Sequence, residues 1–155
     1  MELFVSAMNR DLVVKQGSHI KPRNVKAKSK KSDILKIIAY IYTVKGDVAS
    51  AESNYKAIIA INPNDVETYM DLAYVKLDKK KEIADKMALL GTSAEDMKKY
   101  DELKIKKDEE VKVAVGYLEK ALTLEPSNKD ISKLLLNLYR SLDMTDKYEA
   151  LKAKG

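Results

Sequence analysis

The segment YKAIIAINPND at residues 55–65 decides the fold, because YLEKALTLEPSN at residues 117–128 is a near copy of it. Each copy places an apolar helical stretch before a polar residue and a proline, and a proline ends a helix. The two prolines, Pro63 and Pro126, lie 63 residues apart. A helix ending that occurs twice predicts repeated helical units, and the interval between the copies needs an explanation.

The composition suits one helical domain. The chain has 155 residues, of which 45% are hydrophobic and 34% charged. The absence of cysteine excludes disulfides, thiolate metal sites and a cysteine nucleophile. No apolar run approaches the ~18 residues that cross a membrane, and the N-terminal residues lack the basic start and apolar block of a signal peptide. The chain is therefore expected in the cytoplasm by default, or in the periplasm if it is a fragment or a mature form.

The net charge of +5 comes from one short segment. Residues 20–32 carry six basic side chains and no acidic one, whereas residues 33–155 carry 21 basic and 22 acidic side chains. The basic segment has no aromatic residue to stack on bases, so specific nucleic-acid recognition is not expected. Residues 17–32 are interpreted as a basic, flexible linker.

From residue 33 onward the apolar residues recur at helical spacing, and nothing alternates as in a strand. One helix is predicted to start at a Ser32 or Asp33 cap and to end at Gly46, and a second is predicted to follow and to stop at Pro63. The two would form an antiparallel hairpin. Their inward positions are Leu35, Ile38, Ala39 and Tyr42 in the first helix and Ala51, Tyr55, Ile58 and Ile59 in the second.

On these residues, together with Gly46 and Pro63, residues 32–65 resemble one 34-residue unit of the tetratricopeptide repeat (TPR) family. The segment departs from the family pattern at Ala39, where glycine is commoner, and at Ile58, where alanine is usual. The resemblance implies an all-α fold, a TPR-like α-solenoid of antiparallel helix pairs forming an α-α superhelix.

The second unit, residues 66–126, explains the interval between the prolines. A standard unit would put them ~34 residues apart, so about 29 residues are inserted, at roughly residues 79–107. The insertion is itself helical: Gly91 is expected to stop one helix, and either Thr92 with Glu95 or Ser93 with Asp96 is expected to cap the next. The result is one extended helical hairpin, with helices of about 25 and 32 residues that project on the order of 15–20 Å.

The two ends of the chain complete this scheme. Residues 129–155 resemble a terminal, partial unit, so the repeat domain is placed at residues 33–155. Residues 1–16 resemble the second helix of a preceding unit. This order, with one lengthened repeat before a terminal one, resembles bacterial TPR proteins of the Bacteroidota.

The resemblance also implies a function. TPR stacks bind peptides or partner proteins in the concave groove lined by the first helix of each unit, and so a non-catalytic interaction module or scaffold is expected. Tyr40 and Tyr74 occupy equivalent sites in successive units, and their rings offer apolar area with a hydrogen-bonding tip. The expected groove-facing residues are Lys36, Tyr40, Thr43, Met70, Tyr74, Lys133, Asn137 and Arg140.

Two further features bear on binding. A clamp for a terminal carboxylate, which some TPR domains build from Lys and Asn, is not expected, because Tyr40 and Asp71 stand where asparagines are needed. The tip of the projecting hairpin is a second expected contact surface, unless its apolar side chains only join the two helices to each other. Its residues are Met87, Leu89, Leu90 and Met97.

Catalysis has little support in the sequence. His19 is the only histidine, and no glycine-rich phosphate loop or Gly-x-Ser-x-Gly motif is present. No enzyme activity, cofactor or metal site is therefore expected. The alternative function is structural: a segment of a larger helical array, or a homo-oligomer that associates through its end repeats.

Overall fold

The computed structural model describes residues 25–154, and within them every regular element is a helix. The predictions for residues 1–16, for His19 and for the first part of the linker lie outside the described residues. From Lys31 onward the chain belongs to one unit. Its helices are α2 (Val25–Val44), α3 (Val48–Ile61), α4 (Val66–Ala88), α5 (Ala94–Leu124), α6 (Lys129–Ser141) and α7 (Thr145–Lys152).

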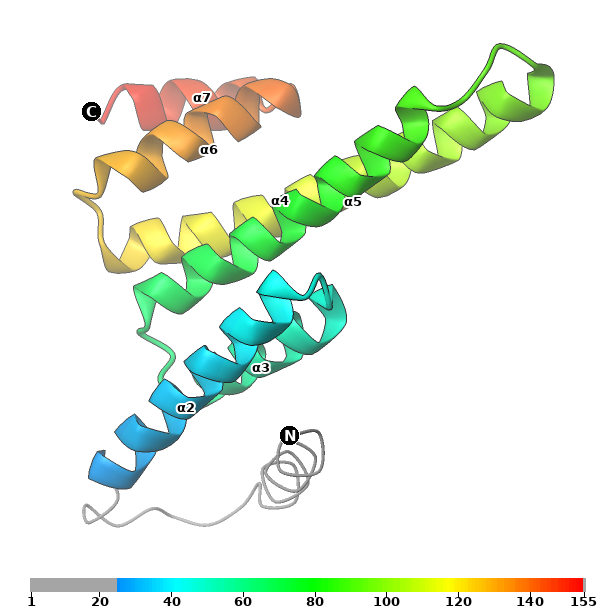
Figure 1. Cartoon of the computed structure of the whole chain (residues 1–155). Helices are drawn as coiled ribbons and strands as arrows, with labels where there is room; N and C mark the ends of the chain where they lie inside the picture. Colours follow the sequence, from blue (N-terminus) through cyan, green and yellow to red (C-terminus); the bar gives the residue numbers. More distant parts are fainter. Residues whose placement is uncertain (1–24, 155) are drawn as a thin grey trace. The chain divides into compact units, whose positions relative to one another are not determined.

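The helices pack as antiparallel pairs. α2 runs antiparallel to α3, α4 packs along α5, and α6 packs on α7 (Figure 1). Successive pairs also contact each other, because α3 packs on α4 and α5 packs on α6. Each pair thus covers an apolar face of its neighbour, as in other helical repeat proteins. The fold is the all-α, TPR-like stack of helix pairs that the sequence predicted.

The middle pair is the extended hairpin. α4 has 23 residues and α5 has 31, close to the predicted lengths. Of the two predicted caps, the structure uses Ser93: its Oγ accepts a hydrogen bond from the backbone N–H of Asp96 at 3.1 Å and donates one to the Asp96 carboxylate at 2.7 Å. A Cβ on Gly91 would lie 2.9 Å from that carboxylate, so glycine leaves room for this cap.

α2 begins earlier than predicted. The helix already runs from Val25, and Ser32 is buried inside it instead of capping its start. Residues 25–32 are mostly lysine, alanine and serine, without a proline or glycine to end a helix. The prediction of a flexible linker is therefore wrong for these residues. The other end is as predicted, since Gly46 has a φ of 74°, the left-handed conformation that glycine adopts most readily.

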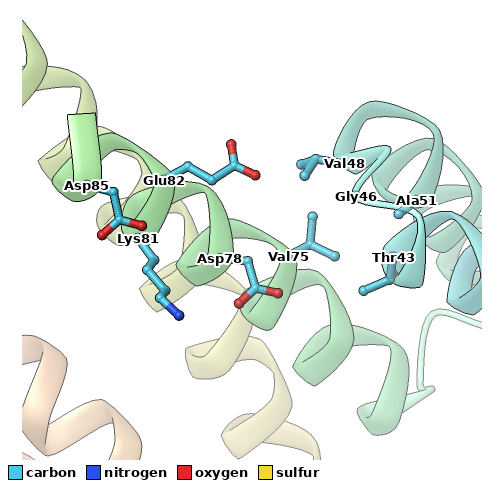
Figure 2. Close-up of a pocket in the computed structure, with 9 residues that line it drawn as sticks. All are labelled: Thr43, Gly46, Val48, Ala51, Val75, Asp78, Lys81, Glu82 and Asp85. Atoms are coloured by element: carbon cyan, nitrogen blue, oxygen red, sulfur yellow. The ribbon is translucent and has the colours of Figure 1, made fainter.

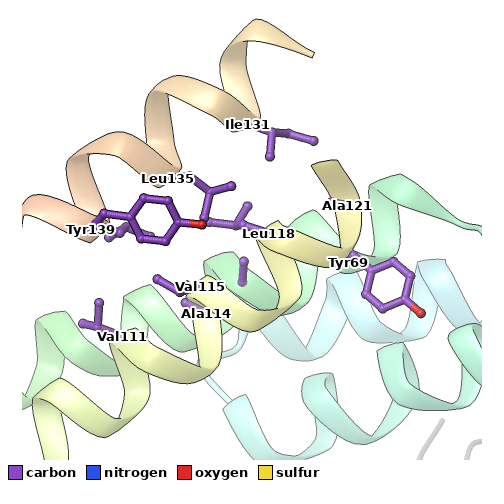
Figure 3. Close-up of a cluster of buried hydrophobic side chains, with 11 residues drawn as sticks. Tyr69, Val111, Ala114, Val115, Leu118, Ala121, Ile131, Leu135 and Tyr139 are labelled. Atoms are coloured by element: carbon purple, nitrogen blue, oxygen red, sulfur yellow. The ribbon is translucent and has the colours of Figure 1, made fainter. Parts of the chain in front are cut away.

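The apolar core lies where the pairs meet. Figure 3 shows Leu135 and Tyr139 of α6 pointing toward Leu118 of α5. The cluster continues to α4 and consists of Tyr69, Ala73, Val111, Ala114, Val115, Leu118, Ala121, Ile131, Leu135, Leu138 and Tyr139. In the first pair, four residues of the repeat pattern are almost completely buried: Leu35, Ala39, Ala51 and Ile58.

An ion-pair network joins α3, α4 and α5. The Lys76 ammonium lies 2.6 Å from a carboxylate oxygen of Glu52 and 3.3 Å from one of Glu110. Lys56 and Lys79 hold the other oxygens of these two carboxylates, at 2.7 and 2.5 Å. Lys76 is only 8% exposed. It stands 34 residues after Tyr42, so the second unit has a buried cation where the first has an aromatic ring.

Candidate functional site

α2 presents three different faces. Leu35 and Ala39 lie on the buried face, and Lys36 and Tyr40 lie about 100° further round the helix, on the face of the predicted groove. The third face carries aliphatic side chains, and these are exposed because nothing in the described part of the chain packs on them. We call it the α2 stripe: Ile34, Ile37, Ile41 and Val44.

The two tyrosines of the predicted groove are open to solvent. Tyr40 is 65% exposed and Tyr74 is 47% exposed. Their neighbours are less available: the Thr43 hydroxyl donates a hydrogen bond to the Ala39 carbonyl at 3.0 Å, and Met70 packs against the core cluster. Among the predicted groove residues of the first two units, Tyr40 and Tyr74 are therefore the ones that best offer a surface to a ligand.

Lys36 is neutralised by the chain itself. Its ammonium lies 2.6 Å from the Glu67 carboxylate and 3.2 Å from that of Asp65. Burial alone would lower the pKa of Lys36, but the hydrogen bonds to Glu67 and Asp65 outweigh it, so the pKa is raised. Lys36 therefore ties α2 to the start of α4 and adds no uncompensated positive charge to the groove.

The predicted groove residues of the third unit lie on α6, where Lys133, Asn137 and Arg140 are exposed. Arg140 is held against α7, because it donates a hydrogen bond to the Tyr148 hydroxyl at 2.8 Å and lies over the Tyr148 ring. Lys133 and Asn137 make no side-chain hydrogen bond within the described residues. Lys133 and Asn137 are therefore open to a ligand, whereas Arg140 is already bound to Tyr148.

Sequence reasoning missed a row of acidic residues on α4. Intervals of three, four and seven residues put them on one side of the helix, with Tyr74 among them. We call this row the acidic stripe: Glu67, Asp71, Asp78, Glu82 and Asp85. Glu67 pairs with Lys36, but within the described residues no basic side chain forms an ion pair with the other four. The spacing alone was the signal that could have revealed it.

Asp71 is the half-buried member of the acidic stripe. Burial, and then the negative charge of Glu67, raises the pKa of Asp71 to about 6. Asp65 acts in the same direction and Lys36 in the opposite one. Because the folded pKa is raised, ionised Asp71 opposes folding at neutral pH; this penalty shrinks as the pH falls below about 6 and is gone below the ordinary value of 3.8.

A cavity of about 310 Å³ adjoins the C-terminal half of the acidic stripe, where α4 passes the turn between α2 and α3 (Figure 2). Its apolar lining includes Val48, Ala51 and Val75, and its charged lining is Asp78, Lys81, Glu82 and Asp85. Figure 2 shows the Glu82 side chain extending toward Val48, whereas Lys81 points away from it. The cavity therefore combines an apolar wall with a carboxylate rim.

The tip of the hairpin differs in part from its prediction. Leu89 is 86% exposed and Met97 is also exposed, whereas Leu90 is half-buried and Met87 is buried. The expectation of an exposed side chain is wrong for Met87, because this residue faces the seam between α4 and α5. Leu89 and Met97 remain the open apolar positions of the tip.

Two kinds of site are not found among the residues that the structure describes. No helix from residue 25 to 154 combines the length and the apolar character that a membrane span needs. In the same part of the chain, no three His, Cys, Asp or Glu side chains come together in a way that could hold a metal ion.

The paired helices define the class of protein: a TPR-like helical repeat stack with one lengthened hairpin. Comparison with known proteins adds little to this. No family model matches the chain, and no curated protein matches it. A solved structure described as the crystal structure of the MamA protein is similar at 25% sequence identity over 81% of this chain and 72% of that chain, with a TM-score of 0.32.

Proposed function

We propose that this chain is a non-catalytic TPR protein that binds a peptide, or a segment of a partner protein, on the face formed by α2 and α4. The observation that carries the proposal is the pair of exposed aromatic rings at equivalent positions of successive units, Tyr40 and Tyr74. Single exposed apolar groups are common on protein surfaces. Two tyrosines repeated along one face instead suit an extended ligand, because each ring offers a large contact area at a small cost in conformational entropy.

The test is a selection of peptides from a displayed library on the wild-type protein, followed by titration of the selected peptides against variants. Tyr40→Ala combined with Tyr74→Ala is expected to weaken binding roughly 30-fold, since aromatic anchors dominate interface energies. Tyr100→Ala is the matched control, because Tyr100 is as exposed as Tyr74 but lies on the projecting hairpin. Selected peptides that bind the double variant as tightly as the wild type would show that the groove is not the site.

A second candidate function is self-association, and the α2 stripe favours it. Its four aliphatic residues follow one another at intervals of three, four and three, the spacing of a coiled-coil seam. In an antiparallel pairing of two copies about a twofold axis, Ile34 would lie opposite Val44, and Ile37 opposite Ile41. Lys30 and Lys31 would then lie beside the C-terminal end of the other α2, where the helix dipole is negative.

Light scattering over a range of concentrations tests this candidate. The wild-type chain is expected to have a mass of twice 17.5 kDa. Ile37→Glu is expected to reduce this to the mass of a monomer, because a buried charge at the seam is costly. Ile105→Glu is the control, since Ile105 is exposed to the same extent, 61%, on the projecting hairpin. A wild-type chain that stays monomeric at every concentration would reject self-association.

A further inference from the structure

Building on the proposed function, we infer that the cavity between α3 and α4 receives an arginine or lysine side chain, and that the partner is a basic segment lying along the acidic stripe. The inference adds the chemical class of the ligand to the proposed groove. It depends on the shape and lining of the cavity, on the distribution of charge around α4, and on the half-buried carboxylate of Asp71.

The lining of the cavity matches a long basic side chain. Arginine and lysine have an apolar stem that packs on apolar surface and a charged head that stays near water or a counter-charge. Val48 and Val75 supply the apolar wall, and the carboxylates of Asp78 and Glu82 stand at the rim. A volume of about 310 Å³ is at the lower limit for ligand sites, which suits one side chain better than a whole ligand.

Acidic side chains predominate on one side of α4, where Lys81 stands among them. Lys76 and Lys79 point toward α3 and α5, where they pair with Glu52 and Glu110. On the side of the acidic stripe, Glu67 precedes Asp71 and Asp78 precedes Glu82 by four residues, and like charges at this spacing repel each other. Because three carboxylates and one ammonium line the cavity, its net charge is complementary to a basic ligand.

Asp71 and Tyr74 extend the preference for a basic ligand toward the proposed groove. Asp71 is half-buried, burial raises its pKa, and no basic side chain of the described residues forms an ion pair with it. Tyr74 lies exposed next to it along the stripe, and a guanidinium stacks well on an aromatic face. Both features favour arginine over a neutral or acidic side chain at this point of the groove.

The spacing of the stripe predicts the spacing of the ligand. Asp71, Asp78 and Asp85 follow one another every seven residues, or roughly 10 Å along the helix axis. A peptide in the polyproline II conformation covers about 3.1 Å per residue and turns once every three residues, so every third side chain faces the same way. Basic side chains at every third position of the partner would therefore meet successive aspartates. A chelated metal ion fits less well, since no three acidic side chains converge on one point within the described residues.

The test uses fluorescence anisotropy with a fluorescein-labelled ten-residue peptide that has arginine at every third position and glycine or serine between. The full-length chain is expected to bind it, and to show no binding of the same peptide with glutamate in place of arginine. Asp78→Asn with Glu82→Gln is expected to weaken binding at least 10-fold. Asp101→Asn with Glu102→Gln removes the same charge from exposed positions of α5 and is expected to change affinity less than twofold.

Two outcomes would overturn the inference: no binding of the arginine peptide, or an equal loss of affinity in both pairs of variants. The proposed groove can be right or wrong independently of this result. If library selection on the wild type yields neutral or acidic peptides whose binding needs Tyr40 and Tyr74, the groove stands and the basic ligand is wrong. If the arginine peptide binds through Asp78 and Glu82 but ignores both tyrosines, the cavity stands and the groove is wrong.

Discussion

Replacing Lys76 by methionine is expected to lower the free energy of unfolding by about 2 kcal/mol at neutral pH. Methionine has nearly the same length, so the main change is the loss of the cation between Glu52 and Glu110. Removing one partner of a fully buried ion pair costs more, but here the two carboxylates are 17% and 16% exposed and keep Lys56 and Lys79. Urea denaturation followed by circular dichroism measures the difference.

The effect of this substitution should depend on pH. Burial alone would raise the pKa of Glu52, but hydrogen bonds from Lys56 and Lys76 outweigh it and hold the pKa below its ordinary 4.5. Burial would likewise lower the pKa of Lys76, but Glu52 and Glu110 raise it above 10.5. The contribution of the pair is therefore complete between these two ordinary values. It is lost as the pH falls through the lowered pKa of Glu52 or rises through the raised pKa of Lys76.

Lys79→Met is the matched control for Lys76→Met. Lys79 belongs to the same network, but its side chain is 44% exposed, and ion pairs near the surface contribute between about 0 and 1 kcal/mol. A cost for Lys76→Met no larger than that for Lys79→Met would contradict the structural role of the buried cation. A cost that stays unchanged as the pH falls through the lowered pKa of Glu52 would also do so, because a protonated carboxyl group no longer needs a counter-charge.

Leu118→Ala is expected to lower the free energy of unfolding by about 3 kcal/mol, the larger of the two effects. Leu118 is completely buried where α5 meets α6, among Ile131 and Leu135. Truncation would remove its apolar contacts and leave a cavity that helices on both sides cannot fully close. For a domain of this size the expected decrease in melting temperature is on the order of 6–12 °C.

Leu89→Ala is the control for this substitution. The same atoms are removed at the exposed tip of the hairpin, and so the melting temperature should change by less than about 2 °C, as for most surface substitutions. Equal effects at Leu118 and Leu89 would mean that α6 does not pack on α5 in solution. That result would contradict the stacking of helix pairs on which the groove depends.

The fold was largely predictable because its signals are local. Pro63, Gly46 and the apolar spacing of α3 mark helix ends and faces within a few residues of each other. The start of α2 was not predictable in the same way. Ser32 and Asp33 form a credible cap, but the preceding lysines and alanine also favour a helix, and nothing local decides between the two. The choice between Thr92 and Ser93 as a cap was equally open and was decided by the geometry of the turn.

The candidate site was predictable only in part. The equivalence of Tyr40 and Tyr74 follows from the repeat length alone, and both are exposed as expected. The charge of the groove did not follow from the sequence, because a count of basic residues includes Lys36 and Arg140 without showing that each has a partner. The spacing in the sequence could have revealed the acidic stripe, but only the structure shows that Lys36 and Arg140 have partners of their own.

The sequence by itself determined which segments are helices, where most of them end, and that the second pair is longer than the first. These properties depend on interactions between residues close together in the chain. Only the tertiary structure decided which charges remain unbalanced and which apolar faces remain open. Lys36 and Lys76 lie far along the chain from some of the carboxylates that neutralise them, and such pairings arise only when the helix pairs stack.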